Sequence, residues 1–227
     1  MTPLIACAHG TRSEKGRETI AALVAAVADL LPDVDVLPAF VDVQEPEIDD
    51  VVAVAASAPV VVPVLLSRGF HTRVDIARAV GSRAGSVQTA PLGPHPLLAE
   101  VVRDRIAAAV DVAGGDHIVF AAAGSTDPRA VDDVEAQVAL LRTLVSAPVS
   151  IGYAAGASPT IADAVAAARA AGATRVIAAS YVLAPGFFAD VVVRAGADVT
   201  TDVLGADERI ARVVVERYRA ALGAAAG

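Results

Sequence analysis

The strongest constraint on the fold is a regular alternation of short apolar runs and amphipathic stretches along the whole chain. The apolar runs are rich in valine, isoleucine and alanine, and the stretches between them place apolar residues at helical spacing. Alternating strands and helices are typical of a parallel sheet with helices on both faces. The predicted strands are 4–8, 34–41, 60–66, 87–90, 117–122, 148–153, 175–183 and 199–202. The predicted helices are 17–31, 47–56, 72–84 with Thr72 as its N-cap, 96–112, 129–145, 160–171, 187–194 and 206–222.

This pattern runs through the chain twice, restarting after Gly114-Gly115. Self-similarity at a fixed period indicates a duplicated structural unit. We therefore predict an α/β protein with two tandem flavodoxin-like or Rossmann-like parallel-sheet units, each βαβαβαβα, at residues 1–113 and 114–227. Aligning the two halves pairs equivalent positions of the repeat. The aligned pairs are Gly69 with Gly186, Phe70 with Phe187, His71 with Phe188, Leu92-Gly93 with Leu204-Gly205, and His9 with Gly124.

Two histidines of the first half follow predicted strands closely. His9 comes directly after the first strand, and His71 follows the turn Ser67-Arg68-Gly69-Phe70 after the third. In the flavodoxin-like order 2-1-3-4 these strands are neighbours, and ligands bind outside their carboxyl ends. Both histidines are confined to the first half, whereas the glycines recur in both. We therefore predict that the two imidazoles meet at this edge of the first unit and form a functional site.

The residue after the second strand is the natural third contributor, because that strand is predicted beside the first. Asp42 and Glu45 are both candidates, and Asp42 is closer to the strand end. Two imidazoles and a carboxylate suit Fe²⁺, Co²⁺, Ni²⁺ or Zn²⁺. A neutral imidazole also accepts protons near neutral pH. Of the other histidines, we expect His95 to be a helix cap or a pocket-lining residue and His117 to be structural.

Several function classes lack their sequence signals. The chain contains no GxxxxGK[ST], GxGxxG or GxSxG motif, which argues against ATP, dinucleotide and serine-nucleophile sites. With 18 Lys+Arg against 26 Asp+Glu, the net charge of −8 argues against nucleic acid as a partner. Mean hydropathy is +0.58, yet no apolar run is long enough to span a membrane.

The expected location is the cytoplasm. The N-terminus lacks a secretion signal. The single cysteine, Cys7, falls in the first strand and is expected to be buried, which suits a reducing compartment. The oligomeric state stays open between monomer and homodimer.

Four motifs together resemble one known family. HGTR after the first strand, AFVDVQEP after the second, LLSRGFHTRVDI after the third and LGPHPLL after the fourth are similar to the ATP-independent sirohydrochlorin chelatases of the CbiX/SirB type. The resemblance covers the whole chain and corresponds to the long, two-unit form of that family. It implies insertion of Fe²⁺ or Co²⁺ into sirohydrochlorin, in siroheme or cobalamin biosynthesis, with the metal as substrate and without ATP or any nucleotide.

The resemblance also implies roles for individual residues. His9 and His71 correspond to the catalytic, metal-handling histidines, and Asp42 stands as a metal ligand where the family usually has the longer glutamate. Because the tetrapyrrole carries many carboxylates, arginines are its expected partners. The expected substrate-binding residues are Gly10, Thr11, Arg12, Arg68, Gly69, Phe70 and Arg73. The alternatives are a non-catalytic metallochaperone or tetrapyrrole carrier on the same scaffold, and a divergent metal-dependent hydrolase.

Overall fold

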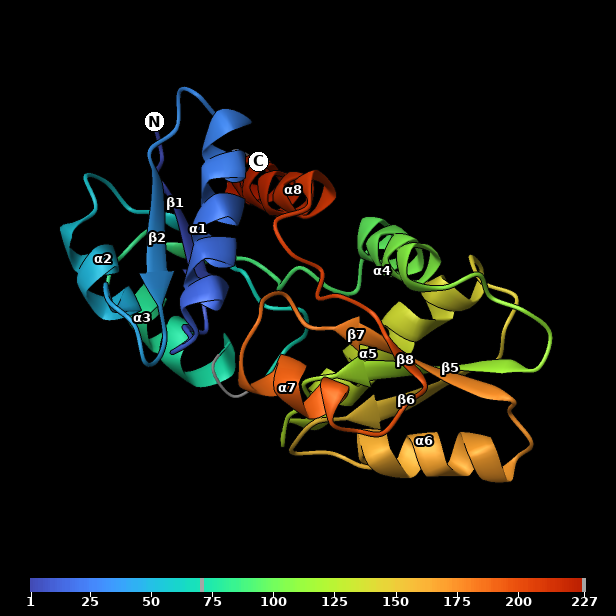
Figure 1. Cartoon of the computed structure of the whole chain (residues 1–227). Coiled ribbons are helices and arrows are strands. Elements are labelled where there is room, and N and C mark those ends of the chain that lie inside the picture. Colours follow the sequence, from blue (N-terminus) through green and yellow to red (C-terminus); the bar gives the residue numbers. More distant parts are fainter. Residues whose placement is uncertain (70–71, 226–227) are drawn as a thin grey trace. The chain divides into compact units, whose positions relative to one another are not determined.

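The computed structural model describes residues 1–69 and 72–225, and it contains two parallel sheets (Figure 1). Each sheet has four strands, in the orders β2-β1-β3-β4 and β6-β5-β7-β8. The predicted α/β class, the strand order and the repeated topology are therefore confirmed. The strands are β1 Leu4–Ala8, β2 Val36–Phe40, β3 Val60–Pro63, β4 Val87–Gln88, β5 Asp116–Ala122, β6 Val149–Tyr153, β7 Arg175–Tyr181 and β8 Val199–Thr200.

Helices follow the strands in the predicted alternation. They are α1 Glu14–Asp29, α2 Ile48–Val54, the π-helix η1 Thr72–Ile76, α3 Ala77–Gly81, α4 Pro96–Ala109, α5 Pro128–Arg142, α6 Ile161–Ala170, α7 Phe187–Val193 and α8 Glu208–Ala225. Helix α1 begins three residues earlier than predicted because the Ser13 hydroxyl accepts a hydrogen bond from the Gly16 N–H and caps it. None of the helices in the described part of the chain is long and apolar enough to cross a membrane.

The third predicted helix differs most from the structure. Thr72 is not an N-cap but the first residue of the π-helix η1, and α3 ends at Gly81 instead of Ala84. A π-helix closes i→i+5 hydrogen bonds, a pattern that hydrophobic spacing does not reveal. Ser82 is the C-cap of α3, and its backbone N–H still donates to the carbonyls of the last turn.

The central strand of the first sheet, β1, determines at which edge of the sheet the loops after β1 and β2 begin. Strand β1 is buried along its whole length and pairs with β2 on one side and β3 on the other. Its last residue, Ala8, lies opposite Phe40, the last residue of β2. The segments after β1 and β2 therefore leave the sheet at the same edge, as the sequence predicted for parallel strands.

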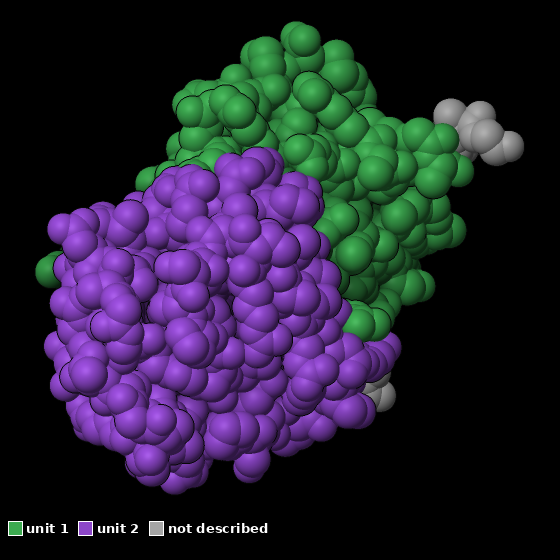
Figure 2. Space-filling model, turned by 90° about the vertical axis from the view of Figure 1, so that its right-hand side faces the viewer, with its two compact units in different colours: residues 1–92, 206–227 green, residues 93–205 purple. Residues whose placement is uncertain are grey.

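The chain divides into two compact units that differ from the two sequence halves. Unit 1 comprises Met1–Leu92 with Ala206–Gly227, and unit 2 comprises Gly93–Gly205 (Figure 2). Helix α8 packs on β3 and α1, whereas α4 packs on α5 and β7. The last helix of each half thus belongs to the other unit, and the compact units are not the expected 1–113 and 114–227.

Equivalent arginines anchor the two exchanged helices. Arg105 on α4 donates from Nε to the Val203 carbonyl at 3.1 Å and from Nη2 to the Leu204 carbonyl at 2.6 Å. Arg217 on α8 donates in the same way to the carbonyls of Pro91 (3.0 Å) and Leu92 (3.1 Å). Each helix is therefore fixed to the segment that follows the fourth strand of its unit.

Candidate functional site

The loops after β1 and β2 stay paired beyond the ends of the strands. The Val41 N–H donates to the Ala8 carbonyl at 3.1 Å, and the Asp42 N–H donates to the His9 carbonyl at 3.0 Å. His9 is partly buried and Asp42 is exposed. The structure therefore brings together two of the predicted site residues, which are far apart in sequence, at the edge of the first sheet.

Gly10 allows this close approach of the two loops. Its φ of +95° lies in the region that glycine adopts readily. A Cβ atom at this position would lie 1.9 Å from the Asp42 carbonyl oxygen. The glycine of the HGTR motif is thus required by the backbone geometry.

The loop after β2 is braced from inside. The Phe40 N–H donates to the Pro46 carbonyl at 3.0 Å and closes the loop. The Val43 N–H donates to the Asp42 Oδ1 at 2.8 Å, and Val43 adopts a φ of +54°, an uncommon conformation for a β-branched residue. Backbone strain of this kind is concentrated at functional sites.

Gln44 ties this loop to the one that carries His9. Its Oε1 accepts a hydrogen bond from the Thr11 N–H at 3.0 Å. Gln44 was not among the predicted site residues, because an amide has no charge and belongs to no catalytic motif. The available signal was its place between the two candidate carboxylates, Asp42 and Glu45.

The ring of His9 contacts its own loop. Nδ1 lies 3.3 Å from the carbonyl oxygen of Gly10. Because a carbonyl oxygen only accepts, this hydrogen bond requires the proton on Nδ1. In the neutral ring, Nε2 then carries the lone pair, which can accept a proton or coordinate a metal.

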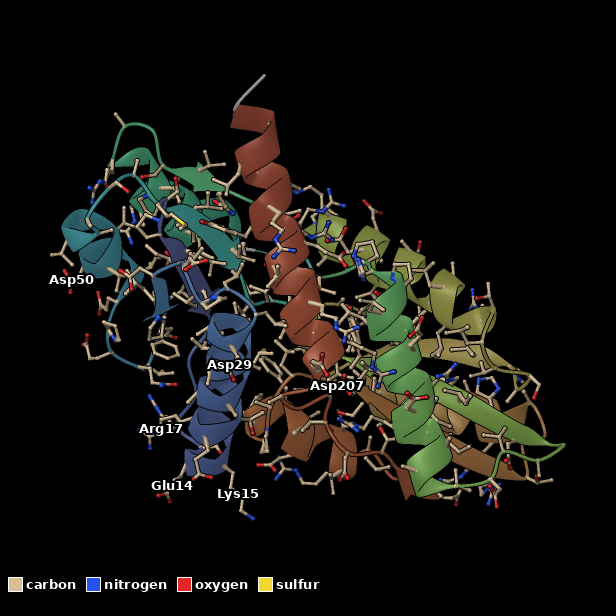
Figure 3. All side chains as sticks on the ribbon, turned by 90° about the horizontal axis from the view of Figure 1, so that it is seen from above. Glu14, Lys15, Arg17, Asp29, Asp50 and Asp207 are labelled. Atoms are coloured by element: carbon tan, nitrogen blue, oxygen red, sulfur yellow. The ribbon has the colours of Figure 1, made fainter. Side chains whose placement is uncertain are left out.

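Basic side chains lie at the start of α1. Arg12, Lys15 and Arg17 are exposed, and Figure 3 shows Lys15 and Arg17 directed away from the helix. Arg17 lines an open pocket of about 510 Å³ together with Val43, Gln44 and Glu45. The pocket wall therefore carries a positive charge from Arg17 and a negative charge from Glu45. It also includes Gln44, which accepts the hydrogen bond from the loop that carries His9.

The third contributing segment is described only in part. Arg68 and Gly69 follow β3 and are partly buried, and Arg73 belongs to η1. His71 and Phe70 lie outside the described residues, so the meeting of His9 and His71 stays a prediction. Within residues 1–69 and 72–225, no group of three His, Cys, Asp or Glu side chains is placed to hold a metal ion.

The other two histidines have structural partners. The Nδ1 of His95 accepts from the Leu97 N–H at 3.2 Å and caps α4, one of its two expected roles. His117 Nε2 lies 2.9 Å from the Ser150 hydroxyl, and burial lowers the pKa of this imidazole below its usual 6.5. Cys7 is fully buried as expected, and burial together with the charge of Asp75 raises the pKa of its thiol to about 12.

Unit 2 repeats the backbone of this site. The Ala155 N–H donates to the Ala123 carbonyl at 3.0 Å, as Asp42 does to His9. Gly124 has a φ of +81°, and a Cβ atom there would lie 2.0 Å from the Ala155 carbonyl oxygen. Gly124 is therefore the counterpart of Gly10, and the expected match of His9 with Gly124 was wrong by one residue.

The corrected match shows what differs between the units. His9 corresponds to Ala123, Asp42 to Ala155, Gln44 to Ala157, and the strained Val43 to Gly156, which has a φ of +70°. The backbone frame is thus common to both units, whereas the polar side chains at the three positions occur only in unit 1.

Solved proteins share this fold of two parallel α/β units. SirB from Bacillus subtilis, solved with Fe³⁺, superposes with a TM-score of 0.79 at 20% identity over 96% of this chain and 95% of that one. CbiX, described as the terminal enzyme for biosynthesis of siroheme in denitrifying bacteria, superposes with a TM-score of 0.70 at 22% identity over 96% and 99%. At these identities the likeness establishes the fold.

Sequence comparison identifies the family. The CbiX family model matches residues 3–109 and again residues 117–221, and the chain belongs to the CbiX family. The sirohydrochlorin cobaltochelatase of Methanothermobacter thermautotrophicus is 28% identical over 130 residues, 45% of this chain and 88% of that protein. The sirohydrochlorin cobaltochelatase of Methanopyrus kandleri is 27% identical over 136 residues, 47% of this chain and 95% of its own length. Each relative thus matches a part of this chain that has about the length of one repeat.

Proposed function

We propose that this protein inserts a divalent metal, Fe²⁺ or Co²⁺, into sirohydrochlorin without ATP, in siroheme or cobalamin biosynthesis. Membership of the CbiX family and the names of its sirohydrochlorin cobaltochelatase relatives support the reaction. The observation that carries the site assignment is the comparison between units. His9 and Asp42 stand on a backbone frame that unit 2 reproduces with alanines in their places.

The reaction requires few groups from the protein. The macrocycle must lose two pyrrole protons, and the metal must exchange water for ring nitrogens. In the proposed mechanism His9 Nε2 accepts one pyrrole proton, His71 holds the metal, and the second pyrrole proton passes to solvent. Asp42 supplies a carboxylate beside His9. Few ligands suit this task because the ion must be released into the ring.

The substrate's carboxylates require cationic or N–H partners. Arg12, Arg68 and Arg73 are the proposed partners through charge-assisted hydrogen bonds. Gly10, Thr11, Gly69 and Phe70 complete the proposed substrate-binding set. We place the activity in the cytoplasm, which agrees with the complete burial of the single cysteine, Cys7.

Two histidine substitutions test this function. We expect His9→Ala and His71→Ala each to lower kcat/KM for metal insertion by about 100-fold or more, because each removes a group that transfers protons or holds the metal. The measurement is the absorbance change of sirohydrochlorin with Fe²⁺ and with Co²⁺ under anaerobic conditions. The ratio of the two rates identifies the preferred metal.

The matched control is His117→Ala, which removes a histidine of unit 2 that is bonded to Ser150. It should retain the wild-type rate if it folds, as checked by circular dichroism. Wild-type rates in both site variants would contradict the mechanism. Tight binding of metal and tetrapyrrole without acceleration over the spontaneous reaction would instead support the carrier function.

A further inference from the structure

A single peptide group lies between Gln44 and the ring of His9. The N–H of the Gly10–Thr11 peptide donates to Gln44 Oε1 at 3.0 Å, and the carbonyl of the same peptide lies 3.3 Å from His9 Nδ1. In a planar trans peptide the N–H and the C=O point in opposite directions. Fixing one end of this peptide therefore fixes the direction of the other end.

We propose that Gln44 is a positioning residue that selects the tautomer of His9. By holding the Thr11 N–H, it keeps the Gly10 carbonyl directed at His9 Nδ1, so that Nδ1 carries the proton and Nε2 carries the lone pair. Linked hydrogen bonds of this kind also polarise one another. The statement that Nε2 is the reacting nitrogen rests on the proposed function, whereas the tautomer selection does not.

The loop needs such a restraint at this position. Gly10 has no side chain, and glycine rotates its backbone more freely than any other residue. The neighbouring hydrogen bond from the Asp42 N–H reaches the His9 carbonyl, which lies on the other side of Gly10. That bond therefore leaves the Gly10–Thr11 peptide plane able to rotate, and Gln44 is the group that fixes it.

Gln44 is itself well placed to serve as a fixed acceptor. It is partly buried, and its loop is closed by the hydrogen bond from the Phe40 N–H to the Pro46 carbonyl at 3.0 Å. The preceding residue, Val43, is held by the side chain of Asp42 at 2.8 Å. Gln44 Oε1 therefore belongs to a loop that its own hydrogen bonds hold in place, and it accepts from the loop that carries His9.

Unit 2 shows that the fold of these loops does not depend on the glutamine. Ala157 replaces Gln44 and Ala123 replaces His9, yet Gly124 keeps a positive φ and the Ala155 N–H still bonds to the Ala123 carbonyl. The glutamine and the histidine therefore occur together in one unit and are both missing from the other. A substitution of Gln44 should accordingly leave the fold intact.

The tautomer of His9 can be measured directly. In protein labelled with ¹⁵N-histidine, ring nitrogen shifts at a pH where the imidazoles are neutral report which nitrogen carries the proton. Wild-type protein should show His9 protonated on Nδ1. Gln44→Leu removes the acceptor at similar volume and should give a mixture of tautomers. Gln44→Glu keeps an acceptor oxygen and should restore the wild-type signal.

The ring of His117 is the internal control, because it is bonded to Ser150 in unit 2 and should not change in either variant. In the metal-insertion assay we expect Gln44→Leu to lower kcat by about tenfold or more with KM within twofold, since groups that orient such histidines have effects of this size. Gln44→Glu should recover most of kcat.

The outcomes separate the positioning role from the proposed function. An unchanged His9 tautomer in Gln44→Leu would overturn the positioning role, even if His9→Ala abolishes metal insertion. A changed tautomer together with wild-type activity of His9→Ala would support the positioning role and overturn the proposed role of His9. A rise in KM with unchanged kcat would show that Gln44 contacts the substrate instead.

Discussion

At the scale of single residues, Gly10 decides whether the site can form. Its φ is positive, and a Cβ atom there would lie only 1.9 Å from the Asp42 carbonyl oxygen, so the position has room only for hydrogen. The sequence placed Gly10 in a candidate substrate-binding loop, and its binding role stays a prediction. The close packing of the two loops around it became visible only in the structure.

Gly10 and Gly172 offer a matched pair of substitutions. Both have nearly the same φ, +95° and +94°, but a Cβ atom at Gly172 would have no heavy atom within 4 Å. Gly172→Ala should therefore cost only the dihedral strain, roughly 1–2 kcal/mol. Gly10→Ala adds a backbone clash and should cost at least about 2 kcal/mol more.

The measurement for this pair is the free energy of unfolding in urea, with circular dichroism as the signal. Equal losses in the two variants would show that the loops after β1 and β2 separate easily. Such a result would contradict the close approach of Gly10 to Asp42.

Residue roles were predictable to an uneven degree. His9 and Asp42 were predicted because each follows a strand closely, and ligands of parallel α/β sheets bind outside the carboxyl ends of the strands. Gln44 was not predicted, since its proposed role depends on a hydrogen bond to a residue 33 positions away. The match between repeats was wrong by one residue at His9, and the equivalent loop hydrogen bonds, close approaches and positive φ angles identify Gly124 as the counterpart of Gly10.

At the scale of elements, buried strands are joined by side chains as well as by the sheet. Asp116 at the start of β5 accepts hydrogen bonds from Arg175 of β7, from Nε at 3.0 Å and from Nη2 at 2.6 Å. It also accepts from the Ala113 N–H at 2.8 Å. These bonds, first of all the one from Arg175, hold the pKa of Asp116 below its usual 3.8.

This depressed pKa gives a stability that depends on pH. Because the unfolded chain binds a proton at higher pH than the folded chain, the contribution is complete above pH 3.8 and is lost as the pH falls through the folded-state pKa. Asp116→Asn should therefore destabilise the protein at neutral pH, and the difference from wild type should shrink in acid. The measurement is urea unfolding across a series of pH values.

The control for the general effect of removing a negative charge is Asp132→Asn. Asp132 is an exposed residue of α5 and takes no part in the hydrogen bonds of Asp116 with Arg175 and Ala113. A stability gap between wild type and Asp116→Asn that stays constant down to acidic pH would show that the carboxylate's charge contributes nothing.

At the scale of the whole molecule, the exchange of α4 and α8 defines the compact units. Both helices are anchored by an arginine in the same position of the repeat, Arg105 and Arg217. Each arginine donates hydrogen bonds to two backbone carbonyls. A bond from a charged donor contributes about 1.5–3 kcal/mol.

Alanine substitution of these arginines tests the assignment of helices to units. Arg217→Ala should raise hydrogen exchange in β3 and α1 of unit 1, the elements that contact α8. Arg105→Ala should raise it in β7 and α5 of unit 2. The measurement is hydrogen exchange followed by mass spectrometry.

Arg219→Ala, an exposed position on α8, should leave the exchange pattern unchanged. Faster hydrogen exchange in β7 for Arg217→Ala would contradict the assignment of α8 to unit 1. It would favour units that coincide with the sequence halves 1–113 and 114–227.

The sequence by itself determined the α/β class, the duplication and the edge of the sheet where His9 lies. Those features follow from local patterns, namely apolar runs, helical spacing and the residues directly after each strand. Only the tertiary structure decided which unit holds α4 and which holds α8, because the two repeats offer equivalent places for a fourth helix. The bond between Gln44 and Thr11 was decided there too, since hydrogen bonds depend on geometry that residue types alone do not specify.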